Sequence, residues 1–126
     1  MVGEKFVFPF EKLEVYRLAI DLADAIFELL DRLPANKHLR IIGQMEAAVS
    51  SVSQNIAEGK GRQYKKEFVQ FLYIAEGSLF EALVLCELFQ RRKLFSEADV
   101  AIIRQLAEPL DRKLRGLINS LRERQG

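Results

Sequence analysis

The sequence is poor in the residues that build disulfide frameworks, metal centres and low-complexity segments. Its single cysteine and single histidine exclude a disulfide scaffold and the structural zinc patterns. Three prolines and seven glycines in 126 residues exclude a collagen-like or low-complexity chain. With 19 basic and 18 acidic residues, the net charge of +1 gives no overall signal for binding nucleic acid or a membrane surface. We therefore expect a protein without cofactors.

Targeting signals are also missing from the sequence. The stretch Met1–Phe6 lacks the apolar core and small-residue cleavage site of a signal peptide. No run comes close to the roughly 18 uncharged apolar residues of a membrane-spanning helix. With Cys86 as the lone cysteine, a reducing cytoplasm is the expected location. A composition of 49% hydrophobic and 29% charged residues fits one soluble domain over residues 1–126.

Hydrophobic periodicity predicts an all-α protein. The expected helices cover residues 11–32, 37–60, 64–92 and 97–122, after an N-terminal extension over residues 1–10. Pro34 ends the first helix, Asn36 is the expected N-cap of the second, and Ser96 with Asp99 forms a capping-box-like start of the fourth. Because the links are only a few residues long, neighbouring helices should be antiparallel, which predicts an up-down-up-down four-helix bundle.

The first and third expected helices carry more apolar surface than one core requires. The first has two adjacent apolar stripes, and the third has a second apolar face nearly opposite its core face. Large exposed apolar patches usually mark protein interfaces, so we expect a homo-oligomer. The candidate interface residues are Val15, Leu22, Ile26, Tyr73, Phe80, Val84 and Leu88. The alternative is that the N-terminal segment with Phe6, Phe8 and Phe10 folds back over these faces.

A row of small and polar side chains follows the second expected helix. Its members are Gln44, Ala48, Ser51, Asn55 and Glu58. The row is either a hydrogen-bonded packing seam or a groove for a partner or for a small ligand or metal. It carries no strong nucleophile or metal ligand, which favours the seam. Pairing of Glu58 with Arg62, one turn on, is expected ahead of an approach to Glu76.

Residues with catalytic chemistry are scarce. The only histidine, His38, falls near a predicted turn, and Cys86 falls on the core face of the third expected helix. Di-iron bundles need Glu-x-x-His pairs, and no such pair occurs in the sequence. The serines of the second helix have no base nearby in sequence. We therefore expect a protein that is not an enzyme and has no metal site.

Two motifs carry a family resemblance. The first comprises Gln44–Met45, Ala48, Ser51, the run 55–59 and Arg62, and the second is the run 67–81. In combination they resemble the four-helix-bundle proteins encoded in intervening sequences of large-subunit ribosomal RNA genes. Relatives of that family include the accessory variability protein of diversity-generating retroelements. The matching motif positions include Gln44, Ser51, Asn55, Glu58, Arg62, Ser78 and Glu81.

The resemblance has consequences for assembly and partners. It implies an antiparallel bundle that forms a ring-shaped homopentamer. It also implies one alternative function, that of an accessory subunit of a retroelement reverse transcriptase. Many family members carry basic residues just after the Gln of the first motif, whereas this chain has Glu46 and Ala47.

Basic residues gather at both ends of the expected bundle. The two clusters are Lys60, Arg62, Lys65, Lys66, Arg122 and Arg124 at one end, and Arg32, Lys37, Arg40, Arg91, Arg92 and Lys93 at the other. The candidate contacts for a partner are Lys60, Arg62, Lys65, Lys66, Arg91, Arg92 and Lys93. A ring would multiply each cluster into a collar that attracts phosphates. The alternative is that basic residues simply favour solvated turns and helix C-termini. The leading hypothesis is a non-enzymatic oligomeric scaffold that engages RNA or a nucleic-acid-associated protein, and the alternative is a small-ligand or metal-binding bundle that uses the row 44–58.

Overall fold

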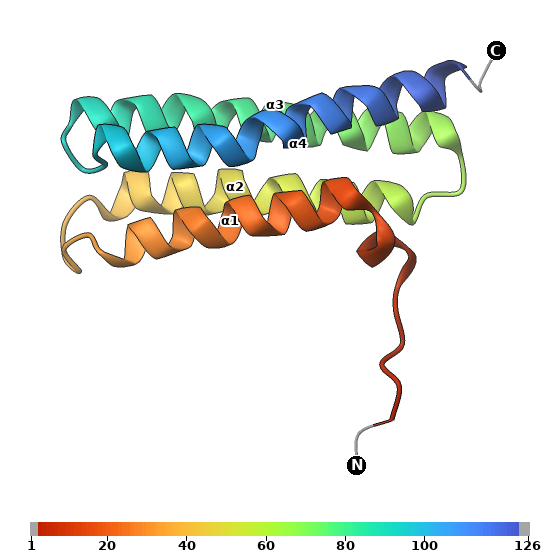
Figure 1. Ribbon diagram of the computed structural model, residues 1–126, viewed down its shortest axis with the longest axis horizontal. Coiled ribbons are helices and arrows are strands. Elements are labelled where there is room, and N and C mark those ends of the chain that lie inside the picture. Colours follow the sequence, from red (N-terminus) through yellow and green to blue (C-terminus); the bar gives the residue numbers. More distant parts are fainter. Residues whose placement is uncertain (1–2, 124–126) are drawn as a thin grey trace.

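The protein is an antiparallel four-helix bundle, as the computed structural model of residues 3–123 shows. The elements are the 3-10 turn η1 (Pro9–Lys12) and the helices α1 (Glu14–Asp31), α2 (Leu39–Lys60), α3 (Lys65–Arg91) and α4 (Glu97–Glu123). Within residues 3–123 there is no strand. In Figure 1, α1 and α2 form one layer and α3 and α4 form the other, and each helix runs opposite to its neighbour in the chain. The predicted all-α, up-down-up-down fold is confirmed.

The helix starts differ in how well the sequence predicts them. At α4 the Ser96 amide donates to the Asp99 carboxylate, and the Asp99 amide donates to the Ser96 hydroxyl, both at 3.0 Å, as the capping pattern predicts. The prediction that Asn36 caps α2 is wrong. That helix starts at Leu39, after His38 in the left-handed region (φ 61°), with no side-chain cap. α1 begins later than predicted because Pro9–Lys12 forms its own turn.

Each helix turns one face toward a shared core. Its largest fully buried side chains include Leu22, Ile26, Met45, Ile56, Leu72, Leu79, Phe89, Ile103, Leu110, Leu114 and Ile118. The assignment of Val15, Leu22 and Ile26 to a subunit interface is therefore wrong, because these side chains are at most 4% exposed within a single chain. Their stripe of α1 faces inward, and Ile20, on the neighbouring stripe, is exposed instead.

The third helix combines core and exterior positions. α3 is long enough, and apolar enough over 18 residues with at most two charged ones, to meet the length and composition criteria of a membrane span. Every 18-residue window of α3 contains the charged residues Glu76 and Glu81, so the helix is not an uncharged run of that length. Phe68, Leu72, Leu79 and Phe89 pack in the bundle core, and a buried core helix meets the same criteria.

Candidate protein and nucleic-acid interface

One outward face of α3 is lined with large apolar side chains. We call Tyr73, Phe80, Val84 and Leu88 the α3 stripe; their exposures run from 38% to 62%. Helical geometry places them on a single face, opposite the core positions. The N-terminal segment does not cover them: Phe6 and Phe8 are themselves exposed, and Figure 1 shows the segment extending away from the bundle. The fold-back alternative is therefore wrong for the face of α3, whereas on α1 Phe10 packs against Tyr16 with ring centroids 4.9 Å apart.

The polar row of α2 meets α3 in a hydrogen-bonded seam. The Ser51 and Ser78 hydroxyls lie 2.8 Å apart, and the Asn55 amide donates to the Ser51 carbonyl at 2.8 Å and to its hydroxyl at 2.9 Å. The helices approach closely beyond this point, because a Cβ on Gly59 would lie only 2.6 Å from the Phe71 Cβ. The middle of the row thus packs between α2 and α3, which agrees with the interpretation of the row as a packing seam.

The ends of the row lie open to solvent. Gln44 is exposed, and Glu58 accepts a hydrogen bond from Arg62 at 2.8 Å in the expected one-turn pair. On α3, Glu81 is exposed, whereas Ser78 is half-buried. The family-motif positions therefore serve two different roles, one in packing and one at the surface.

A buried carboxylate cluster joins α3 to α4. Glu76 is 4% exposed, and Arg115 donates to both of its carboxylate oxygens at 2.9 Å. The pKa of Glu76 is raised, first by burial and then by the neighbouring carboxylate of Asp111, which can accept a hydrogen bond from protonated Glu76 and whose charge repels the ionised form, while Arg115 acts in the opposite direction. The Oδ1 atom of Asp111 is buried and has no hydrogen-bond donor among residues 3–123. No sequence pattern predicts this cluster, and Glu58, the neighbour that the sequence suggested for Glu76, pairs with Arg62 instead.

The cluster offers no sign of a metal centre. Within the described part of the chain, no group of three or more His, Cys, Asp or Glu side chains is placed to hold a metal ion. Cys86 is buried, and desolvation raises the pKa of its thiol to about 12. A thiol with this pKa stays protonated at neutral pH and is a poor nucleophile.

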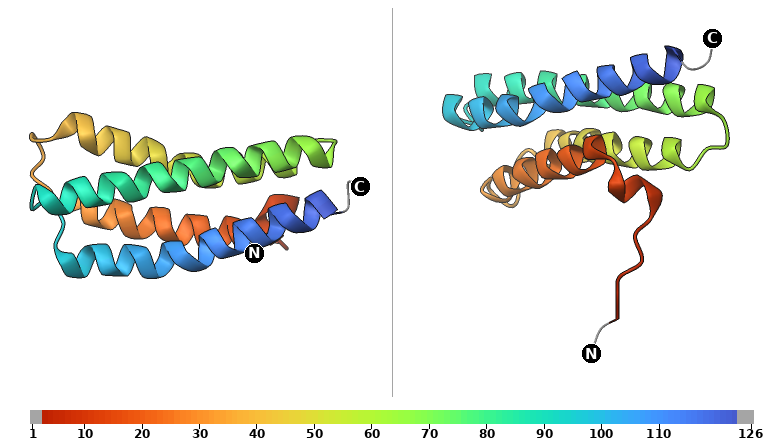
Figure 2. Two further views of the ribbon diagram at one scale, coloured as in Figure 1. Left: turned by 90° about the horizontal axis from the view of Figure 1, so that it is seen from above. Right: turned by 45° about the vertical axis from the view of Figure 1, so that its right-hand side comes forward.

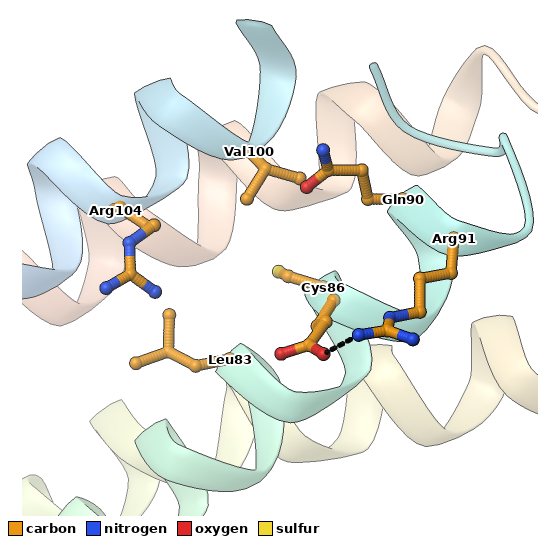
Figure 3. A pocket seen from close by; sticks show the side chains of 7 residues that line it. Leu83, Cys86, Gln90, Arg91, Val100 and Arg104 are labelled. Carbon is orange, nitrogen blue, oxygen red and sulfur yellow. Dashed lines mark ion pairs between the residues drawn. The ribbon is translucent and has the colours of Figure 1, made fainter. Parts of the chain in front are cut away.

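Two adjoining pockets form a groove on the outer side of the α3–α4 pair. The pocket nearer the α3–α4 turn, of about 430 Å³, is shown in Figure 3 and is lined by Leu83, Cys86, Glu87, Gln90, Arg91, Val100 and Arg104. The second, of about 190 Å³, is lined by Phe80, Leu83, Arg104, Ala107, Glu108 and Asp111. Leu83 and Arg104 line both pockets, so we treat them as one feature, the α3–α4 groove. Phe80 links this groove to the α3 stripe.

The predicted basic clusters lie at opposite ends of the bundle. Lys60, Arg62, Lys65 and Lys66 are exposed where α2 passes into α3, and Arg91, Arg92 and Lys93 are exposed where α3 passes into α4. The other predicted members that are described, Arg122, Arg32, Lys37 and Arg40, are exposed too, and Arg124 lies outside the described residues. Figure 2 shows these two turns at the two ends of the molecule.

Part of this positive charge is engaged locally. Arg62 pairs with Glu58, and its guanidinium lies 4.8 Å from the centroid of the Phe71 ring. Arg91 pairs with Glu87 at 3.2 Å. Within residues 3–123, Lys65 and Lys66 at one end and Arg92 and Lys93 at the other form no ion pair. Lys60 also forms no ion pair among these residues, but its ammonium lies 5.8 Å from the centroid of the Phe68 ring. Lys65, Lys66, Arg92 and Lys93 therefore present charge beside the two turns that neither an ion pair nor an aromatic ring of the described residues engages.

The fold and surfaces define an all-α four-helix protein with an unpartnered apolar helix face. Residues 11–116 match the family model described as the 23S rRNA-intervening sequence protein, and the chain belongs to this family. The fold is similar to the crystal structure of a protein of unknown function from the S23 ribosomal protein family of Bacteroides thetaiotaomicron. The two chains share 19% identity with a TM-score of 0.75, over 82% of this chain and 97% of that chain. Among curated proteins, no sequence matches this chain.

Proposed function

We propose that this chain is the subunit of a homo-oligomeric scaffold, without enzymatic activity, that engages RNA or a nucleic-acid-associated protein. The α3 stripe is the observation that carries this proposal. It places four large apolar side chains in water on one helix face. The family resemblance implies five subunits, and we propose that number.

The energetics of the stripe favour self-association. Burying a large apolar side chain fully contributes about 1.5–3 kcal/mol, and these side chains have roughly half of that still to gain. Gly77 lies on the same face, and a Cβ there would meet no atom within 4 Å. A glycine at this point lets a second helix approach closely. The stripe therefore supplies both apolar area and a shape suited to a helix of a second copy.

The basic ends support a nucleic-acid partner. The chain is nearly neutral overall, so any attraction for phosphate comes from local clusters, and a ring would repeat each cluster around its axis. Lys65 with Lys66 and Arg92 with Lys93 are the side chains best placed for this role. A retroelement reverse transcriptase is a nucleic-acid-associated partner that the resemblance implies. Co-purification from the native host separates that partner from RNA alone.

A small-ligand or metal role for the row 44–58 has weaker support. Ser51, Asn55 and Ser78 satisfy one another's hydrogen bonds, and Ala48 is buried. That packing leaves no open groove along the middle of the row. The cytoplasmic location proposed from the lone cysteine is compatible with a scaffold for RNA or its enzymes.

Light scattering and RNA binding test the two halves of the proposal. We expect a mass of several times 14.5 kDa in dilute buffer; a mass of one chain would contradict the scaffold. We also expect binding to structured RNA at low salt that weakens steeply as salt is added. The variants Lys65→Glu/Lys66→Glu and Arg92→Glu/Lys93→Glu change the net charge equally, so each controls for the other and the weaker binder identifies the contact end. Absence of binding by the unaltered protein at low salt would remove RNA as the partner.

A further inference from the structure

The N-terminal segment of residues 3–8, which we call the arm, presents apolar side chains to solvent. Phe6 is 71% exposed and Phe8 is 53% exposed. The Phe6 and Phe8 rings pack edge to face with centroids 4.9 Å apart, and Phe10 packs on Tyr16 of α1 at the same distance. The root of the arm is thus anchored on the bundle while its aromatic tip has no cover. An exposed aromatic tip of this kind is suited to a partner surface.

We propose that the arm of one copy docks in the α3–α4 groove of a neighbouring copy. This inference rests on the proposed oligomer and names the contact that holds its subunits together. The groove continues from the α3 stripe through Phe80, so arm and stripe would belong to one interface.

The arm cannot occupy the groove of its own chain. η1, from which the arm departs, packs on α1 and α2, which form the layer opposite the groove. Figure 1 shows the arm pointing away from α3 and α4. Six extended residues span at most about 22 Å. To reach the outer side of the other layer, the arm would have to pass around two helix layers whose axes are about 10 Å apart. The occupant of the groove is therefore the arm of a second copy.

The groove has the size and spacing to take two aromatic rings. A cavity of about 150 Å³ accommodates benzene, and the two pockets have volumes of about 190 and 430 Å³. Their lining residues are offset by five to six positions along each helix, which corresponds to roughly 8–9 Å. In an extended chain, Phe6 and Phe8 lie on one side with their backbones about 7 Å apart. Each ring can therefore enter one pocket.

Charge selects the direction of the arm in the groove. Arg104 lines both pockets and forms no ion pair within residues 3–123, so its guanidinium is available to the faces of the two rings. With Phe8 in the smaller pocket and Phe6 in the larger, Glu4 extends toward the basic turn after α3. The reverse direction would place Glu4 beside the carboxylates of Glu108 and Asp111. The first arrangement is the complementary one.

Disulfide trapping between copies tests this contact directly. In a Cys86→Ser background, Phe8→Cys/Arg104→Cys, which leaves Phe6 to hold the arm and places the first thiol on the side of the arm that faces the groove, is oxidised and its products are separated under non-reducing conditions. We expect cross-linked species of two or more chains that disappear on reduction. The matched control Phe8→Cys/Ile102→Cys places the second thiol on the exposed side of α4 that faces away from the groove, and we expect no cross-link from it. Light scattering on the unoxidised protein is measured in parallel.

A second variant measures the contribution of the rings. The double variant Phe6→Ala/Phe8→Ala removes both rings. It should raise the concentration at which the oligomer dissociates by about tenfold or more, because two large apolar side chains are no longer buried in the contact. Lys5→Ala, which faces away from both rings, is the control and should leave that concentration unchanged. An oligomer with no cross-link and no response to the ring variant would overturn arm exchange while leaving the scaffold intact. A protein that is monomeric throughout would overturn both, and a cross-link confined to single chains would overturn the exchange.

Discussion

At the scale of single residues, the closest approach between two helices depends on Gly59. A methyl group there would meet the Cβ of Phe71 at 2.6 Å, and that atom cannot move without its backbone. We expect Gly59→Ala to lower the free energy of unfolding by about 1–3 kcal/mol, as overpacking does in other cores. Urea unfolding measures the change. Gly116→Ala in α4 is the control: its added methyl meets nothing within 4 Å, so it should be neutral or stabilise by up to about 1 kcal/mol.

The buried carboxylate cluster makes stability depend on pH. The folded-state pKa of Glu76 is raised above its ordinary value of 4.5, so its contribution to stability is fully present below that value. It is lost as the pH rises through the folded-state pKa. Asp111→Asn removes the neighbouring charge and adds a donor, so the variant should gain about 1 kcal/mol at neutral pH. It should also lose much of the pH dependence above 4.5.

Unfolding at a series of pH values from 4.5 to 7.5, at one protein concentration, checks the cluster prediction. Asp24→Asn, on the exposed face of α1, removes a charge of the same sign and serves as the control. An Asp111→Asn protein with the pH profile of the unaltered protein would show that Asp111 does not set the behaviour of Glu76.

The two charged pairs show how far residue contacts can be predicted from the sequence. Glu58 and Arg62 are one helical turn apart, and that spacing alone predicts their pairing. Glu76 and Arg115 are 39 residues apart in the sequence. They form an ion pair only because α3 and α4 pack with one particular alignment along their axes. No local pattern encodes that alignment, so the most buried ion pair was missed while an exposed one was foreseen.

At the scale of elements, the start of α4 depends on the reciprocal bonds between Ser96 and Asp99. Each side chain accepts from the backbone amide of the other, so the first turn has two of its free donors satisfied. We expect Ser96→Ala to cost about 1 kcal/mol of stability. Chemical denaturation checks this value. Ser120→Ala, near the other end of the same helix, should change stability by much less.

Helix faces were harder to predict than helix positions. α1 carries two adjacent apolar stripes, and helical spacing says nothing about which one meets the core. Leu22 and Ile26 are buried in the core and Ile20 is exposed, whereas Leu22 and Ile26 were expected at a subunit interface. The predicted start of α2 was wrong for a related reason. Asn36 has a side chain suited to capping a helix, but the helix begins after His38, whose backbone is left-handed, and no side-chain preference predicts that conformation.

At the scale of the whole molecule, topology follows from quantities that are local in sequence. Four apolar periodicities and short links leave little choice but an antiparallel bundle, and that prediction is confirmed. Packing between copies has no such local determinant. The sequence shows an excess of apolar surface, and the structure shows that α3 carries much of it outward and that the arm does not cover it. Both observations make the number of subunits in solution the decisive property to measure.

A charge placed in the α3 stripe should prevent assembly without unfolding the subunit. Phe80 is 46% exposed in the isolated chain, so Phe80→Asp introduces a carboxylate that water can solvate in the monomer but that a subunit contact would bury. We expect a species of lower mass than the unaltered protein, with the helical content retained. Ile102→Asp, on α4 and 53% exposed, is the matched control and should keep the full mass. Light scattering with circular dichroism measures both properties, and an unchanged mass for Phe80→Asp would exclude the stripe as the subunit contact.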